Sequence, residues 1–317
     1  MATSDHSVIF ALGGNAILPA GHAGTIDEQY ALTAATMEVV AERIVAGDRV
    51  AIVHGNGPVV GNILLRNEAA KALIPPMPLH ICNADSQGGI GYMVQQVLGN
   101  ELHRRGVSTP IASIVTQVEV DPADPAFAKP AKPIGPFYHD LGQVRELRER
   151  KGWVLAEDAG RGYRRLVPSP RPRSVVEGDV IRALSSQGAV VIAAGGGGVP
   201  VVRRADGALQ GVEAVVDKDL SAALLGRLLG ARMLVLVTAV DHVSRHFGRP
   251  DEEDLPRLNA RELRILLDEG EFPPGSMGPK MEAALDFLAD GGERVVVAST
   301  RNLALACAGR SGTQITA

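Results

Sequence analysis

Short runs of β-branched and aliphatic residues recur along the chain and predict strands covered on both faces. Several runs are continuous in Val, Ile, Leu and Ala rather than alternating with polar residues, as is typical of buried strands in a parallel sheet. The predicted strands are Ser7–Leu12, Arg49–His54, Pro110–Val120, Ala189–Ala194, Met233–Val240 and Glu293–Ala298.

Amphipathic segments lie between these runs and predict helices. In Asp27–Gly47 apolar residues recur at helical spacing, and the segment ends at a glycine, a common helix stop. The other predicted helices are Asp85–Gly106, Val175–Gly188, Asp219–Gly230, Asn259–Leu267 and Lys280–Asp290. This alternation over most of residues 1–317 predicts a single α/β domain, with a mainly parallel sheet and helices on both faces.

One segment, Asp121–Arg173, departs from this alternation because it holds eight of the 20 prolines. Proline at this density is incompatible with a central strand or helix. A short charged helix, Gly142–Gly152, and a hairpin, Trp153–Val167, are predicted between the proline-rich stretches. Long ordered excursions of this kind are commonly lids or binding loops, although a solvated insertion without a role is the alternative.

Composition narrows the class of protein. The 317 residues carry a formal net charge of −4, which argues against a nucleic-acid partner. The start of the chain lacks the pattern of a signal peptide, and the most apolar stretch, Gly188–Val202, is shorter than a membrane span. Cys82 and Cys307 are far apart in apolar stretches, so we expect buried, reduced thiols and a cytoplasmic protein.

Glycine-rich turns follow several predicted strands. They are Gly13-Gly14-Asn15, Gly55-Asn56-Gly57-Pro58 and Gly195 to Gly198, and a further turn, Gly275 to Lys280, opens a late helix. Glycine lets backbone N–H groups approach a ligand closely, and a helix that follows offers its positive end to an anion. One such turn serves ordinary geometry as often as binding, but several at one sheet edge indicate a crevice for phosphate-bearing ligands.

Three lysines lie in informative positions. Lys132 is among prolines, Lys218 lies between Asp217 and Asp219, and Lys280 follows a glycine-rich turn. Lys218 and Lys280 fall at predicted helix N-termini, where a cation opposes the helix dipole and a bound anion would relieve that cost. The two aspartates are either helix caps or groups that orient the lysines for phosphoryl transfer.

The sequence lacks the motifs of other catalytic classes. There is no P-loop, no complete dinucleotide fingerprint, no nucleophile elbow and no clustered histidine or cysteine spacing for zinc. We therefore expect no protein-built metal site, and any metal to be Mg²⁺ held largely by phosphates.

Eight motifs, in order over essentially the whole chain, resemble carbamate kinases of the amino acid kinase superfamily. KPIGPFY at Lys132–Tyr138 and VPSPRP at Val167–Pro172 are specific to this branch, whereas glycine turns are shared more widely. The other six are ALGGNAI at Ala11–Ile17, HGNGP at His54–Pro58, SQGGIGYM at Ser86–Met93, AAGGGGVPV at Ala193–Val201, AVVDKDL at Ala214–Leu220 and GSMGPK at Gly275–Lys280.

The resemblance implies a three-layer α/β/α sandwich around a mainly parallel sheet, with residues 121–173 as a protruding subdomain. It implies a homodimer that uses Mg²⁺ and ATP or ADP, with no nucleic-acid or membrane partner. The implied reaction is reversible phosphoryl transfer between ATP and carbamate, giving ADP and carbamoyl phosphate, in arginine or related nitrogen catabolism.

The resemblance also assigns roles to residues. Lys132 would contact the transferring phosphate or the carbamoyl group, Lys218 and Lys280 would stabilise phosphoryl oxygens, and Asp219 would organise these two lysines. Backbone and amide donors around phosphate and substrate would come from Gly13, Gly14, Asn15, Gly55, Asn56 and Gly57. The nucleotide would lie against Thr238-Ala239-Val240-Asp241, with Ser276 and Met277.

Three positions depart from the family pattern. Val59 stands where Gln is usual, Ser244 stands where Tyr is frequent, and Asn83-Ala84-Asp85 replaces a segment that is often Gly-Ala and a variable residue. Two alternatives stay open: a kinase of another small carboxylate or phosphonate, and a protein that senses nucleotide without turnover. The KPIGPFY segment disfavours the first, and the joint presence of Lys132, Lys218, Asp219 and Lys280 disfavours the second.

Overall fold

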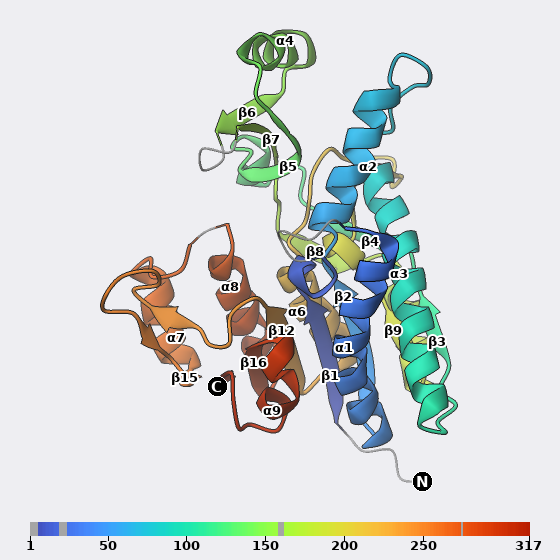
Figure 1. Ribbon diagram of the computed structural model, residues 1–317, viewed down its shortest axis with the longest axis vertical. Helices are drawn as coiled ribbons and strands as arrows, with labels where there is room; N and C mark the ends of the chain where they lie inside the picture. The colour runs from blue at the N-terminus through green and yellow to red at the C-terminus, as the bar shows by residue number, and fades with distance from the viewer. Residues whose placement is uncertain (1–5, 19–23, 158–161, 274) are drawn as a thin grey trace.

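The computed structural model describes residues 6–18, 24–157, 162–273 and 275–317. An eight-stranded sheet forms the centre (Figure 1), and among its neighbouring strands only β16 and β17 pair antiparallel. Its order is β15 (Arg257–Asn259), β17 (Thr313–Thr316), β16 (Arg294–Ser299), β12 (Met233–Thr238), β1 (Ser7–Leu12), β2 (Arg49–His54), β9 (Val190–Ile192) and β3 (Ile111–Ser113).

Helices cover both faces of this sheet, which confirms the predicted three-layer sandwich. Along β1, Ile9 and Ala11 pack into one apolar core, while Val8, Phe10 and Leu12 pack into the other. Helices α5 (Gly178–Ser186), α6 (Lys218–Leu229), α7 (Ala260–Asp268) and α8 (Met277–Ala289) contribute to the first core. Helices α1 (Ile26–Val45), α3 (Leu79–Arg104) and α9 (Leu303–Cys307) contribute to the second.

The predicted strand Pro110–Val120 is wrong as a single element. Its first part is β3 at the edge of the central sheet, and its second part joins another sheet across a break that contains Thr116. The break exists because the buried Thr116 amide donates to the Gln87 side chain, 2.7 Å away, instead of continuing a ladder. This second sheet has the order β11 (Leu209–Gly211), β10 (Val199–Arg203), β4 (Gln117–Val120) and β8 (Pro172–Val175).

Several other boundaries differ from prediction. Helix α3 begins at Leu79, six residues before the predicted start, and Val175 lies in β8 rather than in a helix. Helix α2 (Gly57–Ala70) was not predicted, because only the glycine-rich turn at its start was recognised. A short hairpin, β13 (Ser244–Arg245) and β14 (Glu253–Asp254), was also missed. Cys82 and Cys307 are free and buried, as predicted.

A small lobe stands away from the central sheet (Figure 1). We use "the lobe" for its described elements: β5 (Lys132–Tyr138), α4 (Leu141–Lys151), β6 (Val154–Glu157) and β7 (Tyr163–Val167). β5 is an edge strand of a three-stranded antiparallel sheet, and its pairing with β7 is interrupted between Ile134 and Tyr138. An edge position with an irregular ladder accommodates Pro133 and Pro136, which cannot donate backbone hydrogen bonds.

The predicted helix and hairpin of this excursion are present as α4 and as the β6–β7 pair. Within the described ranges, no helix combines the length and the apolar character needed to cross a membrane.

Candidate active site

A crevice of about 800 Å³ lies where the central strands β1, β2 and β12 end. Carboxyl ends of parallel strands meet at one sheet edge, so residues far apart in sequence converge there. The lobe forms part of the wall through Lys132 to Phe137. Most of the predicted site residues line this crevice: Gly13, Gly14, Gly55, Asn56, Gly57, Lys132, Lys218, Asp219, Thr238, Ser276 and Lys280.

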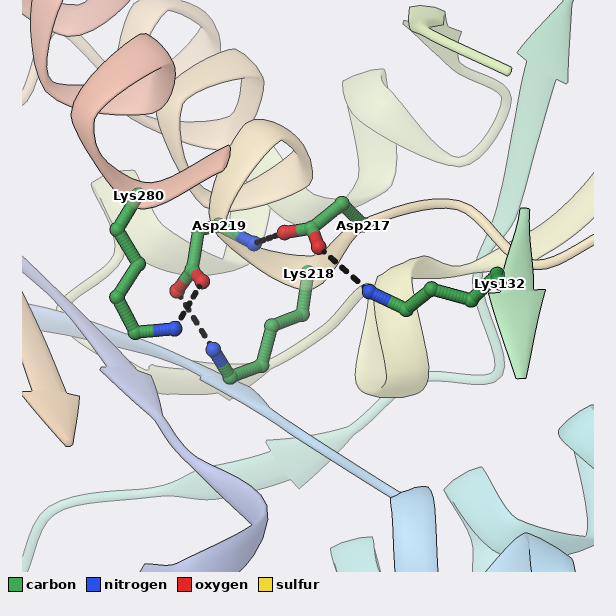
Figure 2. A network of polar contacts seen from close by, with 5 residues as sticks. All are labelled: Lys132, Asp217, Lys218, Asp219 and Lys280. Carbon is green, nitrogen blue, oxygen red and sulfur yellow. Dashed lines mark hydrogen bonds and ion pairs between the residues drawn. The ribbon is translucent and has the colours of Figure 1, made fainter. Parts of the chain in front are cut away.

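Asp219 holds two lysines at the base of α6 and α8 (Figure 2). Lys218 Nζ lies 2.6 Å from Asp219 Oδ1, and Lys280 Nζ lies 2.8 Å from Asp219 Oδ2. The Asp219 side chain is only 2% exposed, and the two lysine side chains are 12% and 13% exposed. This geometry agrees with the predicted role of Asp219, which brings both ammonium groups to one point.

Burial and the shared carboxylate act in opposite directions on the two lysines. Burial lowers the pKa of Lys218, and the nearby Lys280 charge adds to this effect, although Asp219 opposes both. Burial would also lower the pKa of Lys280, but the charge of Asp219 and its hydrogen bond outweigh burial and raise it. A phosphoryl anion would favour the charged form of both groups.

Lys132 reaches the same cluster from the lobe through Asp217 (Figure 2). Its Nζ lies 2.9 Å from Asp217 Oδ2, while Asp217 Oδ1 accepts the Asp219 amide at 2.9 Å as the N-cap of α6. Burial alone would raise the pKa of Asp217, but the charges of Lys132 and Lys218 outweigh it and lower this pKa to about 2. The sequence left Asp217 as a cap or as a group that orients the lysines; in the structure it caps α6 and also pairs with Lys132.

Glycine is needed at these turns mainly because a side chain would collide with neighbouring backbone, and less because the turns offer backbone N–H donors to a ligand. A Cβ on Gly13 would lie 2.7 Å from the Val237 carbonyl oxygen, and a Cβ on Gly55 would lie 3.0 Å from the Gly14 nitrogen. The Gly13 amide donates to Val237 O and the Gly55 amide to Leu12 O, so neither is the ligand donor that was expected. In the described chain, the Gly14 and Gly57 amides, which begin η1 (Gly14–Ala16) and α2, donate no hydrogen bond.

Asn56 also differs from expectation. Its side-chain nitrogen donates to Asn83 Oδ1 at 2.7 Å and to Ser86 Oγ at 2.8 Å, both on α3, so the amide donor points into the protein. Asn83 is one of the unusual positions of the sequence, and no local pattern connects it with Asn56. The backbone of Asn15 lies in η1, but its side chain is outside the described part of the structure.

The expected nucleotide residues divide into two groups. Thr238 and Ser276 line the crevice, whereas Ala239, Asp241 and Met277 are not part of its lining. Asp241 instead accepts hydrogen bonds from Ser299 and from Arg301, the latter at 2.7 Å. The roles of these residues toward a nucleotide stay predictions.

The structure explains two of the unusual positions. Val59 packs against the apolar core on the α1–α3 face, where a Gln would bring a polar amide. Ser244 is buried in β13, and its hydroxyl donates to Asp254 Oδ1 at 2.9 Å across the hairpin. Neither residue is part of the crevice lining.

The crevice offers cations rather than a ready metal cage. Among the described residues, no three His, Cys, Asp or Glu side chains gather as metal ligands. Both Asp217 and Asp219 are engaged by lysines. This donor set fits Mg²⁺ that arrives on nucleotide phosphates, because that ion commonly keeps waters and phosphate oxygens as ligands.

Comparison with known proteins agrees with this geometry. The model of the amino acid kinase family matches residues 7–299. The carbamate kinase of Pyrococcus horikoshii is 46% identical, and the match covers 98% of each chain. The carbamate kinase-like protein YahI of Escherichia coli is also 46% identical, over 97% of this chain and 98% of the relative. The structure of carbamate kinase from Giardia lamblia bound to AMP-PNP superposes with a TM-score of 0.92 at 39% identity, over 99% of both chains. The chain therefore belongs to the amino acid kinase family, and within it to the carbamate kinases.

Proposed function

We propose that this protein catalyses reversible phosphoryl transfer between ATP and carbamate. One observation carries the proposal: three lysines from three separate segments meet around Asp217 and Asp219 in a single crevice. Phosphoryl transfer needs positioning and charge stabilisation more than covalent chemistry from the protein. Carbamate kinases related to this chain over nearly its whole length support the choice of substrate.

The charges of the cluster match such a transfer. Three ammonium groups against two carboxylates leave one net positive charge, and the N-terminus of α6 adds its partial positive charge. An incoming phosphoryl group would therefore meet fixed cations that need no reorganisation. Lys218 and Lys280 would hold the phosphoryl oxygens, Asp219 would keep both lysines in place, and Lys132 would contact the carbamoyl side of the substrate.

In the direction of ATP formation, an oxygen of the ADP β-phosphate attacks the phosphorus of carbamoyl phosphate. The new P–O bond forms as the bond from phosphorus to the carbamate oxygen breaks, and carbamate leaves with that electron pair. Mg²⁺ bound to the nucleotide would neutralise phosphate charge. Lys218, Lys280 and the Gly14 and Gly57 amides would orient the oxygens for an in-line arrangement.

Several finer points belong to the same proposal. The lobe would be part of a mobile subdomain, residues 121–173, that carries Lys132 toward the crevice. The protein would act as a cytoplasmic homodimer, with carbamoyl phosphate from arginine or related nitrogen catabolism as its phosphoryl donor. A sedimentation experiment that returns the 33.3 kDa mass of one chain would exclude the dimer.

The decisive experiment supplies purified protein with ADP, Mg²⁺ and carbamoyl phosphate and follows ATP. We expect many turnovers per protein molecule, and turnover at least about 100-fold slower in Lys218→Ala purified in parallel, which controls for contaminating kinases. Stoichiometric ADP binding with no ATP produced would instead favour a nucleotide sensor and overturn the proposal.

A further inference from the structure

The side chain of Asn56 is held in one orientation by two residues of α3. Asn56, Asn83 and Ser86 are 8%, 2% and 1% exposed, so this network is almost fully removed from water. Both hydrogen bonds from Asn56 Nδ2 run toward the protein, to Asn83 Oδ1 and Ser86 Oγ. Buried amides normally satisfy their donors and acceptors, so the identity of each partner decides which way the amide faces.

The orientation follows from a carbonyl group that can only accept. Asn83 Nδ2 lies 2.6 Å from the carbonyl oxygen of Gly198, so the nitrogen of Asn83 must face that carbonyl. Its Oδ1 is thereby turned toward Asn56. Since Oδ1 can only accept, the Asn56 side chain must present its nitrogen there, and a flipped amide would set two oxygens against each other.

Ser86 by itself would not fix this direction. A hydroxyl can donate or accept, so Ser86 could serve either face of the Asn56 amide. In the structure the Ser86 hydroxyl donates to the Asn83 backbone carbonyl at 2.7 Å and accepts from Asn56. The directional information therefore comes from Asn83.

The glycine turn after β9 makes room for this pair. A Cβ on Gly196 would lie 2.1 Å from Asn56 Nδ2 and 2.6 Å from Asn83 Oδ1. Gly196 also has φ +64, a conformation that favours glycine. Any side chain at this position would collide with the amide pair, so the pair depends on glycine here.

One polar atom of Asn56 remains for a ligand. Asn56 lines the crevice, and in the described chain its Oδ1 receives no hydrogen bond. The same turn lies against the catalytic cluster, because a Cβ on Gly55 would come within 3.3 Å of Lys218 Cδ. The crevice therefore offers an acceptor close to the lysines that would hold the phosphoryl group.

We propose that Asn83 is a positioning residue that sets substrate selectivity by making Asn56 present a hydrogen-bond acceptor to the crevice. The inference rests on the proposed function and deepens it. A carbamoyl group carries N–H donors beside the reacting carboxylate, so it can satisfy Asn56 Oδ1. An acetyl group puts a methyl in that place and leaves the acceptor unpaired, and sites built around a hydrogen bond reject such analogues.

The test compares kcat/KM for ATP formation from carbamoyl phosphate with that from acetyl phosphate. In the wild-type protein we expect a preference for carbamoyl phosphate. In Asn83→Ala the Asn56 amide can flip, and the preference should fall about five- to tenfold, the worth of one ordinary hydrogen bond. The matched control is Ser86→Ala, which also removes one hydrogen bond from Asn56 but keeps the Asn83 acceptor, so the preference should persist.

The outcomes separate the inference from the function on which it rests. No ATP from carbamoyl phosphate in the wild-type protein would remove the proposed function itself. Turnover with an unchanged preference in a folded Asn83→Ala variant would overturn the inference. Equal losses of preference in Asn83→Ala and Ser86→Ala would also overturn it, because they would indicate that Asn83 gives only structural support. If Asn83→Ala does not fold, Asn83→Ser takes its place in the test. The serine hydroxyl can donate or accept, so it does not fix the direction of the Asn56 amide.

Discussion

The lobe and the rest of the described structure, which we call the body, bring lysines to the same crevice in different ways. In the body, Lys218 and Lys280 side chains are 12% and 13% exposed and share one buried carboxylate. In the lobe, Lys132 is 30% exposed, and its bond to Asp217 is its one ion pair across to the body in the described structure. Two ammonium groups of the body are therefore held in place by a shared buried carboxylate. The third ammonium group, that of Lys132 in the lobe, is held to the body by one ion pair.

The apolar core beneath the body lysines is also larger than the one beneath the lobe lysine. The body buries a large apolar core on each face of its sheet, but the apolar core of the lobe contains four buried residues: Tyr138, Val144, Leu147 and Leu155. A cavity of about 410 Å³ lies at the junction between lobe and body. The junction is held by a small apolar cluster, in which Ile134 and Val167 of the lobe pack with Val60, Leu79 and Cys82, and by the ion pairs Lys151–Glu68 and Arg165–Glu213. This contact is much smaller than either core of the body, so motion is expected in the lobe rather than in the body.

Removing a body lysine should have the largest effect. Lys218→Ala and Lys280→Ala should each lower kcat about 100- to 1,000-fold, because a preorganised electrostatic group is lost. The measurement is steady-state ATP formation, with thermal unfolding to show that each variant is folded. Arg204→Ala is the control, since Arg204 pairs with Asp206 on an exposed turn, and it should retain full activity. Turnover near the wild-type rate in either lysine variant would remove that lysine from the mechanism.

Removing the lobe lysine should separate chemistry from nucleotide binding. Lys132→Met keeps most of the side-chain bulk but loses the charge, so kcat should fall about 100-fold while ADP affinity changes little. The control is Lys129→Met, which changes an exposed lysine of the same segment and should leave kcat and ADP affinity unchanged. Hydrogen exchange across 121–173 should slow when ADP and a phosphate analogue are bound. If ligands leave hydrogen exchange in this segment unchanged and Lys132→Met turns over normally, the segment is only a solvated insertion.

The contact between lobe and body can be weakened without removing the lysine. Asp217→Asn keeps an N-cap acceptor for the Asp219 amide but removes the charge that holds Lys132, so kcat should fall about five- to tenfold. Asp217→Ala loses the cap as well and should cost about 1 kcal/mol of unfolding free energy in addition. Equal activity losses in Asp217→Asn and Lys132→Met would contradict the expectation that Lys132 acts beyond this ion pair.

A last effect concerns pH-dependent stability rather than activity and lies in the body. Burial lowers the pKa of His54 to about 4 from its ordinary 6.5, despite the hydrogen bond with the Gly55 carbonyl. Above pH 6.5 the imidazole is neutral in both states. As the pH falls from 6.5 toward 4, the unfolded chain binds a proton that the folded chain does not, so up to about 3 kcal/mol is lost.

His54→Gln should flatten this part of the stability curve, measured by denaturant unfolding at several pH values. Activity at pH 8 is the separate readout, since the side chain faces the Gly195 turn rather than a substrate. A variant whose stability keeps the wild-type pH dependence would show that another group causes the loss.

Local sequence predicted the framework well, because strand and helix preferences depend on near neighbours. β1 and β2 coincide with the predicted strands, since continuous β-branched runs mark them clearly. The break at Thr116 was not predictable, because it depends on Gln87, 29 positions away. The lysines and Asp219 were found from their motifs, while Asp217 was undecided until its partner Lys132 was located.

The sequence by itself therefore determined the sandwich, the glycine turns at the sheet edge and the residue types that carry charge. Tertiary structure alone decided which groups face a ligand. The Gly13 and Gly55 amides are taken up by neighbouring strands, and the Asn56 amide is turned by Asn83, which Gly198 orients from 115 positions away. Hydrogen-bond direction depends on such distant partners, and spacing along the chain contains no information about them.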